Sequence, residues 1–82
     1  MRVVRSEEQL FRVFAEVLKV EIASVTEASS PETTPNWDSL ATVNLVAELE
    51  QAFGVQFDIL EIVEFHSVGI VKSILMEKGV VF

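Results

Sequence analysis

Residues 35–46, with the sequence PNWDSLATVNLV, decide the fold of this chain. Asp38 comes immediately before a long apolar run, and an Asp there accepts hydrogen bonds from the free N–H groups of a helix's first turn. The helix is expected to run to Phe53, because Gly54 then supplies the left-handed residue with which many helices end. The stretch therefore predicts a capped helix that begins beside Ser39.

This predicted helix has more apolar surface than one core can use. Successive residues lie roughly 100° apart, which separates two apolar faces. The first face consists of Thr42, Leu45, Val46, Leu49 and Phe53, and the second of Leu40, Val43 and Ala47. The second face is either a docking surface or a contact with another helix of a bundle.

Three further helices are expected. The first covers about 7–19, begins with a capping box of Ser6 and Gln9, and is followed by a long loop over 21–36 that Ile22 and Val25 pin to the core. A short, largely apolar helix covers about 59–65, with Asp58 near its start. The last covers about 68–78, although its β-branched start also permits a strand. Ser67 caps this last helix, Gly79 ends it, and its inward residues are Val68, Val71, Ile74 and Leu75.

Charge and composition exclude several functions. The chain has 82 residues, which is enough for one domain over 1–82, and its net charge is −7. It contains no Cys, which excludes thiolate chemistry. Nine carboxylates and no Lys or Arg lie between Val20 and Val71. The negative electrostatic field of this segment disfavours the binding of nucleic acid and attracts basic protein surfaces. With no segment that resembles a signal peptide or a membrane span, a cytoplasmic protein is expected.

Ser39 is the strongest candidate for chemistry. A serine in the first turn of a helix holds its hydroxyl near the positive end of the helix dipole, where a phosphate ester is tolerated. From its position alone, however, a role as a second capping residue is favoured for Ser39. A serine hydrolase would need His66 as its base, and the chain lacks a G-x-S-x-G elbow. The chain has one His and no Cys, which are too few of the usual side-chain ligands for a zinc site.

The residues resemble an acyl carrier protein. The resemblance covers about 7–79 and is strongest over 38–57, where D-S-L is followed by T-V-x-L-V-x-x-L-E-x-x-F. It implies an all-α fold: a four-helix bundle with a long loop between its first two helices and a short third helix. It also implies that the protein is not an enzyme.

The resemblance further implies that Ser39 holds 4′-phosphopantetheine, which a phosphopantetheinyl transferase installs from coenzyme A. Acyl or aminoacyl groups would travel on this arm as thioesters. Asp38 would assist recognition by the transferase, and a monomeric carrier would dock on acyl-transferring or acyl-activating enzymes with basic surfaces. The docking residues would be Leu40, Val43, Ala47, Glu48, Glu50, Asp58, Glu61 and Glu64.

Departures from the family pattern leave one alternative open. Fatty-acid carriers usually have acids where this chain has Ala41 and Asn44, and a glycine where it has Asn36. The chain could therefore be an unmodified, acidic interaction module with a carrier-like fold. The short third helix also has three apolar residues in addition to those that the family pattern buries: Ile59, Leu60 and Val63. These residues either line an acyl cavity or contact a dedicated partner protein.

Trp37, the single tryptophan, raises a separate hypothesis. We expect it to cover the end of the bundle where the long loop meets the second helix. Its packing would fix the backbone so that Asp38 caps the helix and Ser39 projects from it.

Overall fold

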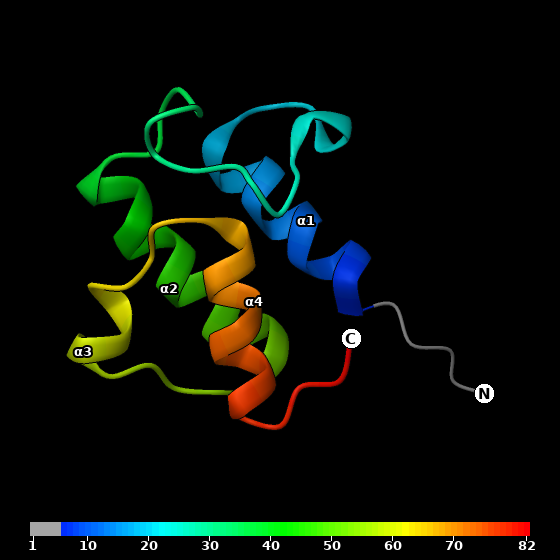
Figure 1. Ribbon diagram of the computed structural model, residues 1–82, viewed down its shortest axis with the longest axis vertical. Coiled ribbons are helices and arrows are strands. Elements are labelled where there is room, and N and C mark those ends of the chain that lie inside the picture. The colour runs from blue at the N-terminus through cyan, green and yellow to red at the C-terminus, as the bar shows by residue number, and fades with distance from the viewer. Residues whose placement is uncertain (1–5) are drawn as a thin grey trace.

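Helix α1 (Ser6–Leu18) opens the fold in the computed structural model, which describes residues 6–82 (Figure 1). The elements that follow are the 3-10 helix η1 (Ile22–Ser24) and the helices α2 (Ser39–Phe53), α3 (Ile59–Ile62) and α4 (Val68–Glu77). Residues 6–82 contain no strand, so the permitted strand at the start of α4 is wrong and the all-α prediction is confirmed. Within the same range, no helix is long and apolar enough to cross a bilayer.

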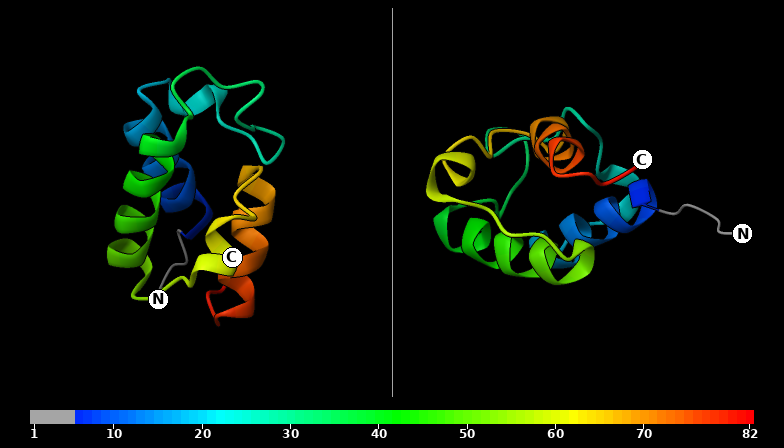
Figure 2. Two further views of the ribbon diagram at one scale, coloured as in Figure 1. Left: turned by 90° about the vertical axis from the view of Figure 1, so that its left-hand side faces the viewer. Right: turned by 90° about the horizontal axis from the view of Figure 1, so that it is seen from below.

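The helices form two layers. Figure 2 shows α1 and α2 on one side of the molecule and α3 and α4 on the other, with the α1–α2 loop across one end. The largest fully buried side chains lie between these layers, and they are Leu10, Phe14, Leu18, Leu45, Leu49, Val68, Val71 and Leu75. The apolar residues predicted to face inward from the last helix are therefore confirmed.

The ends of α2 follow the prediction from local sequence. The Asp38 Oδ1 atom accepts a hydrogen bond of 2.9 Å from the Ala41 N–H. At the other end Gly54 has φ 67° and its N–H donates to the Glu50 carbonyl oxygen. The predicted capping box of α1 involves the side chain of Ser6, of which the structure describes only the backbone.

The α1–α2 loop contains a short helix and docks on α4. Val25 is buried as predicted, but Ile22 is 41% exposed, so its predicted pinning role is wrong. The loop is held instead by main-chain hydrogen bonds from the Val68 N–H to the Ser29 carbonyl oxygen (3.0 Å) and from the Gly69 N–H to the Glu27 carbonyl oxygen (2.9 Å). These bonds satisfy N–H groups that the first turn of α4 cannot pair internally.

Lys72 strengthens the same contact from within α4. Its Nζ atom lies 2.9 Å from a carboxylate oxygen of Glu7 in α1 and 2.9 Å from one of Glu27 in the loop. It also lies 5.5 Å from the centroid of the Phe82 ring. One side chain thus connects α1, the loop, α4 and the C-terminal residue.

Helix α3 is shorter than predicted, ending at Ile62 rather than near residue 65. After Ile62 the hydrogen bonds change to the i to i+3 pattern, from Glu64 N–H to Glu61 and from Phe65 N–H to Ile62. This tighter turn brings Phe65 into the core, where its ring meets that of Phe57 edge-on at 5.3 Å between centroids. The start of α4 follows the prediction, since the Ser67 hydroxyl accepts from the Ile70 N–H at 3.1 Å.

Candidate functional site

Ser39 is the first residue of α2, and its side chain is exposed. The neighbouring Asp38 provides the N-cap, and no residue within 6–82 forms a hydrogen bond with the Ser39 hydroxyl. Ser39 is therefore not occupied as a second capping residue in the described structure. Its hydroxyl is accessible to an approaching enzyme.

Trp37 fixes the chain immediately before this serine. Its side chain is 5% exposed, and its ring packs edge-on against that of Phe14, with 5.4 Å between centroids. Its Nε1–H donates to the Thr42 Oγ1 atom at 3.2 Å, and the Thr42 hydroxyl donates to the Asp38 carbonyl oxygen at 3.1 Å. The expected burial of Trp37 at the junction of loop and helix is confirmed.

Asn36 adds a second restraint, which the sequence analysis did not identify. Its backbone has φ 74°, and its side-chain Nδ2 donates to the Leu18 carbonyl oxygen at 2.9 Å. Its own carbonyl oxygen accepts from the Asp38 N–H at 3.1 Å. The available signal was its residue type, because asparagine tolerates positive φ better than most residues.

The start of α2 suits a phosphoryl group on Ser39. Helix α2 has 15 residues, and its first turn contains no acidic side chain. The positive end of the helix dipole therefore lies beside the hydroxyl without a carboxylate of that turn to repel a phosphate. Asp38 comes before this turn, and its Oδ1 atom is directed to the Ala41 N–H.

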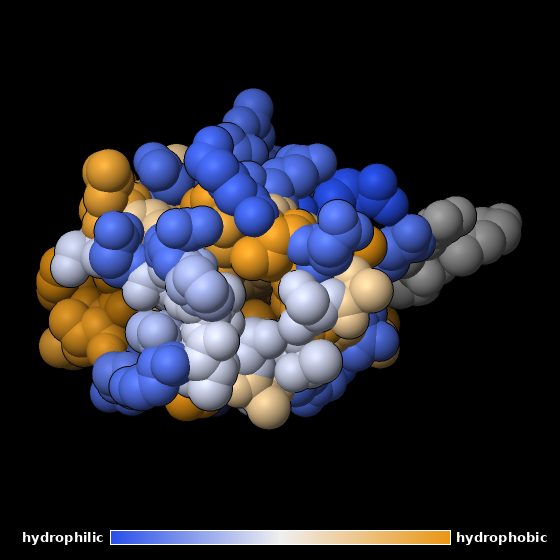
Figure 3. Space-filling view, turned by 90° about the horizontal axis from the view of Figure 1, so that it is seen from above, coloured by the Kyte–Doolittle hydropathy of each residue, from blue (hydrophilic) through white to orange (hydrophobic). Residues whose placement is uncertain are grey.

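The second apolar face of α2 does not pack on another helix. Leu40 is 70% exposed, Val43 is 63% exposed and Ala47 is also exposed, so the bundle-contact alternative is wrong. Two residues of α3, Ile59 and Leu60, and its C-cap residue, Val63, are exposed as well. Figure 3 shows apolar side chains gathered at one edge of the molecule, the side on which Figure 1 places α3 and the beginning of α2.

The predicted acidic rim divides into exposed and structurally engaged side chains. Glu48, Asp58 and Glu64 are exposed. The Glu50 Oε2 atom instead accepts a 2.9 Å hydrogen bond from the Phe57 N–H, and so holds the link between α2 and α3. The Glu61 Oε1 atom lies 2.8 Å from the Lys78 Nζ atom and accepts from the Asp58 N–H. Hydrogen bonds from Lys78 and from the Asp58 main chain hold the pKa of Glu61 below its ordinary value.

Ala41 and Asn44, where acids are frequent in fatty-acid carriers, have different surroundings. Ala41 is buried in the core, whereas Asn44 is exposed. An acid at position 41 would lose solvation here, so the absence of charge at that position has a packing reason.

His66 lies in the link between α3 and α4 and is exposed. Within residues 6–82, no hydrogen bond joins it to Ser39. The geometry therefore gives no support to a serine hydrolase in which His66 acts as base.

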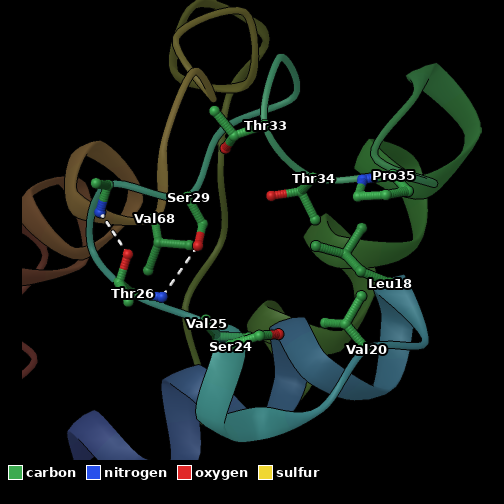
Figure 4. Close-up of a pocket in the computed structure, with 11 residues that line it drawn as sticks. Leu18, Val20, Ser24, Val25, Thr26, Ser29, Thr33, Thr34, Pro35 and Val68 are labelled. Atoms are coloured by element: carbon green, nitrogen blue, oxygen red, sulfur yellow. Dashed lines mark hydrogen bonds between the residues drawn. The ribbon is translucent and has the colours of Figure 1, made fainter.

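A cavity of about 420 Å³ lies beneath the α1–α2 loop (Figure 4). Leu18, Val25 and Val68 contribute apolar walls, and several loop hydroxyl groups complete the lining. The sequence analysis identified the loop but not the cavity. The signal was the loop's length, which is uncommon in a compact domain and often accompanies function.

Comparison with protein families gives one match over most of the chain. The family model described as "Phosphopantetheine attachment site" matches residues 8–71, a range that includes most of α1, all of α2 and α3, and the start of α4. A comparison with curated proteins gave no match.

Proposed function

Because the chain belongs to the phosphopantetheine attachment site family, we propose that Ser39 is the residue that holds its 4′-phosphopantetheine arm. Domains of this family are covalent carriers of that group and are not themselves catalysts. When bound, the arm supplies a thiol on which acyl or aminoacyl groups form thioesters. The protein's own residues hold the serine at an accessible position and present a surface to partner enzymes.

The observation that carries this proposal is the contrast between Ser39 and the residues around it. Trp37 is buried, Asp38 is engaged as the helix cap, and Ala41 is in the core, yet the Ser39 side chain is exposed. A transferase needs a free hydroxyl on a rigid backbone, because the reacting oxygen must be aligned with the phosphorus atom. Ser39 meets both requirements.

We also propose that Leu40, Val43 and Ala47 form the apolar centre of the docking surface, with Glu48, Asp58 and Glu64 at its rim. Exposed apolar side chains surrounded by charge are typical of protein interaction sites. Partners would be a phosphopantetheinyl transferase and acyl-transferring or acyl-activating enzymes with basic docking surfaces. Glu50 and Glu61 would contribute less, since both form hydrogen bonds within the carrier. A monomeric, cytoplasmic carrier of one domain over 1–82 remains the proposed form.

The second candidate is an unmodified interaction module that uses the same surface. The exposed Asn44 favours it, because an acid is frequent there in fatty-acid carriers. In this case the Ser39 hydroxyl would have no role, and the surface alone would explain the function.

Intact-mass spectrometry separates the two candidates. The purified protein is incubated with coenzyme A, magnesium and a broad-specificity phosphopantetheinyl transferase. The proposal predicts a gain of one phosphopantetheine in the wild type and in Ser73→Ala, which removes another exposed helical serine, and no gain in Ser39→Ala. Absence of the gain in a folded wild type, with more than one transferase, would favour the unmodified module.

A further inference from the structure

A groove of about 490 Å³ lies between α3 and α4, in the layer that Figure 2 places opposite α1 and α2. Three apolar residues line it, Leu60 of α3 and Ile70 and Ile74 of α4. Leu60 is 74% exposed and Ile70 is 37% exposed, whereas Ile74 is buried and so lies at the base. The groove therefore leaves apolar side chains of two helices in contact with water.

Carboxylates surround these apolar residues. Asp58, Glu61, Glu64 and Glu77 all line the groove. Glu61 is paired with Lys78, and the Asp58 carboxylate accepts the Glu61 N–H as the cap of α3. Within residues 6–82, the side chains of Glu64 and Glu77 are exposed and form no ion pair or hydrogen bond. The rim of the groove therefore has negative charge that basic groups of the described structure do not neutralise.

The two walls of the groove are fastened to each other. Lys78, the C-cap of α4, places its Nζ atom 2.8 Å from the Glu61 Oε1 atom and 5.5 Å from the centroid of the Phe57 ring. The Phe57 ring packs edge-on against Phe65, which is buried. These contacts connect α3, a helix of only four residues, to the end of α4. A groove whose walls are already fixed requires less ordering when a ligand binds.

The charge of the rim restricts what can occupy the groove. An uncharged lipid chain would deprive the carboxylates of hydration without replacing it. Nucleic acid, or the same groove of a second copy, would place negative charge against negative charge. A partner segment with apolar side chains between Lys or Arg residues complements both the apolar lining and the acidic rim.

The groove is separate from the exposed apolar face of α2. Ile70, Ser73 and Glu77 line the groove from α4, which lies in the opposite layer from α2 (Figure 2). The two surfaces share only acids of their borders, Asp58 and Glu64. The exposed face of α2 belongs to one helix and is convex, so it suits a depression on an enzyme. The groove lies between two helices and is concave, so it suits a helix.

We propose that the groove between α3 and α4 is a second docking site, which takes a basic amphipathic helix of a partner protein. The apolar side of that helix contacts the three apolar residues of the groove, and its Lys or Arg side chains pair with Glu64 and Glu77. Proteins commonly recognise an amphipathic helix by laying its apolar side in such a groove. The inference goes beyond the carrier role and does not depend on modification of Ser39. The partner can hold the carrier while Ser39 stays available to another enzyme.

The test uses the full chain and a synthetic helical peptide of Leu, Ala and Lys, about four turns long, with its Leu residues on one side. A peptide of the same composition in scrambled order controls for charge alone. Amide NMR shifts are expected at Leu60, Glu64, Ile70, Ser73 and Glu77. Fluorescence anisotropy of the labelled peptides should show binding at least about tenfold tighter for the helical peptide.

Two matched pairs of variants locate the site. Glu77→Lys reverses a charge of the rim and should weaken binding of the helical peptide by about tenfold. Glu16→Lys makes the same charge change at an exposed acid of α1 and should have an effect of about twofold or less. Leu60→Ala should also weaken binding, whereas Leu40→Ala, at a leucine of similar exposure in α2, should not.

The mass gain from phosphopantetheine provides an independent readout. Glu77→Lys should gain the same mass as the wild type, because its surface is separate from that around Ser39. Loss of the gain in this variant would show that the transferase uses the groove and would overturn the separation of the two sites. Shifts centred on α2, equal effects within either pair of variants, or no binding of the helical peptide would overturn the second docking site. None of these peptide results would affect the carrier role.

Discussion

The side-chain amide of Asn36 donates a 2.9 Å hydrogen bond to the carbonyl oxygen of Leu18, which joins the turn before α2 to the last residue of α1. Leu18 is at a helix end, where carbonyl groups lack partners within the helix. Asn36 supplies one from a backbone with φ 74°, a conformation that most side chains disfavour. Asn36 therefore supplies a hydrogen-bond partner for the end of α1 and also makes the left-handed turn that leads to Trp37 and Ser39.

Substitutions at Asn36 should separate these two roles. Asn36→Gly removes the side-chain bond but accepts positive φ, so we expect a loss of about 1 kcal/mol in the free energy of unfolding. Asn36→Ala also strains the left-handed backbone, which should add about 1–2 kcal/mol. Urea denaturation of the two proteins measures the difference. Equal stability of the two variants would show that the backbone conformation at this position carries no strain.

Trp37→Ala should be the most destabilising single change near the site. The substitution leaves a cavity against Phe14 and frees the Thr42 hydroxyl, with an expected loss of about 3 kcal/mol. Trp37→Phe retains an aromatic ring and should lose about 1 kcal/mol with the Nε1–H bond. Thermal unfolding monitored by circular dichroism provides the comparison. An unchanged midpoint in Trp37→Ala would contradict the observed burial.

Gly69 is constrained by the loop that docks on it. A Cβ atom added there would lie 3.1 Å from the Glu27 carbonyl oxygen, which accepts a hydrogen bond from the Gly69 N–H. Lys72 pairs with the side-chain carboxylate of the same Glu27. A glycine to alanine change within a helix normally stabilises, by about 0.5–1 kcal/mol. Here we expect Gly69→Ala to lose about 1 kcal/mol instead, because the loop must move. A gain in the urea midpoint would show that the loop yields without cost.

Lys72 should make stability depend on alkaline pH. Hydrogen bonds to Glu7 and then to Glu27 raise the pKa of this ammonium group above its ordinary value of 10.5. A raised pKa means that the folded state binds the proton more tightly, so the stabilisation is complete below the unfolded pKa and is lost as pH rises through the folded pKa.

Melting temperatures measured from neutral pH to well beyond 10.5, so that the range passes the raised pKa of Lys72, test this sign. Relative to the wild type, Lys72→Met should be less stable at neutral pH, and the gap should narrow as pH rises. Lys19→Met, at an exposed lysine, is the control and should show a constant difference. A gap in Lys72→Met that stays constant across the titration would contradict an electrostatic role for Lys72.

The parts of the fold that depend on neighbouring residues could be predicted from sequence. Asp38 and Gly54 set the ends of α2, and Ser67 sets the start of α4, through hydrogen bonds within a few positions of each residue. The two apolar faces of α2 follow from helix geometry alone. The exposure of Leu40 could not be deduced, because it depends on where the other helices pack.

Several features that depend on distant contacts were missed or wrongly predicted. Helix α3 ends early because Phe65 turns inward onto Phe57, eight positions before it in the chain. Val25 is buried and Ile22 is exposed. The loop sequence has no hydrophobic periodicity from which this difference could have been predicted. The cavity requires the docking of residues 27 and 29 on α4, a contact about 40 positions apart with no local signature.

The central claim is that Ser39 holds the phosphopantetheine arm, and fragmentation mass spectrometry of the proteolysed, transferase-treated protein tests it most directly. The account predicts that fragment ions place the modification on Ser39 alone. It should be absent from Ser29, Ser30, Thr33 and Thr34, the hydroxyl residues of the preceding loop. A modification located on any of those residues, or an unmodified Ser39 in a protein that gained the mass, would contradict it.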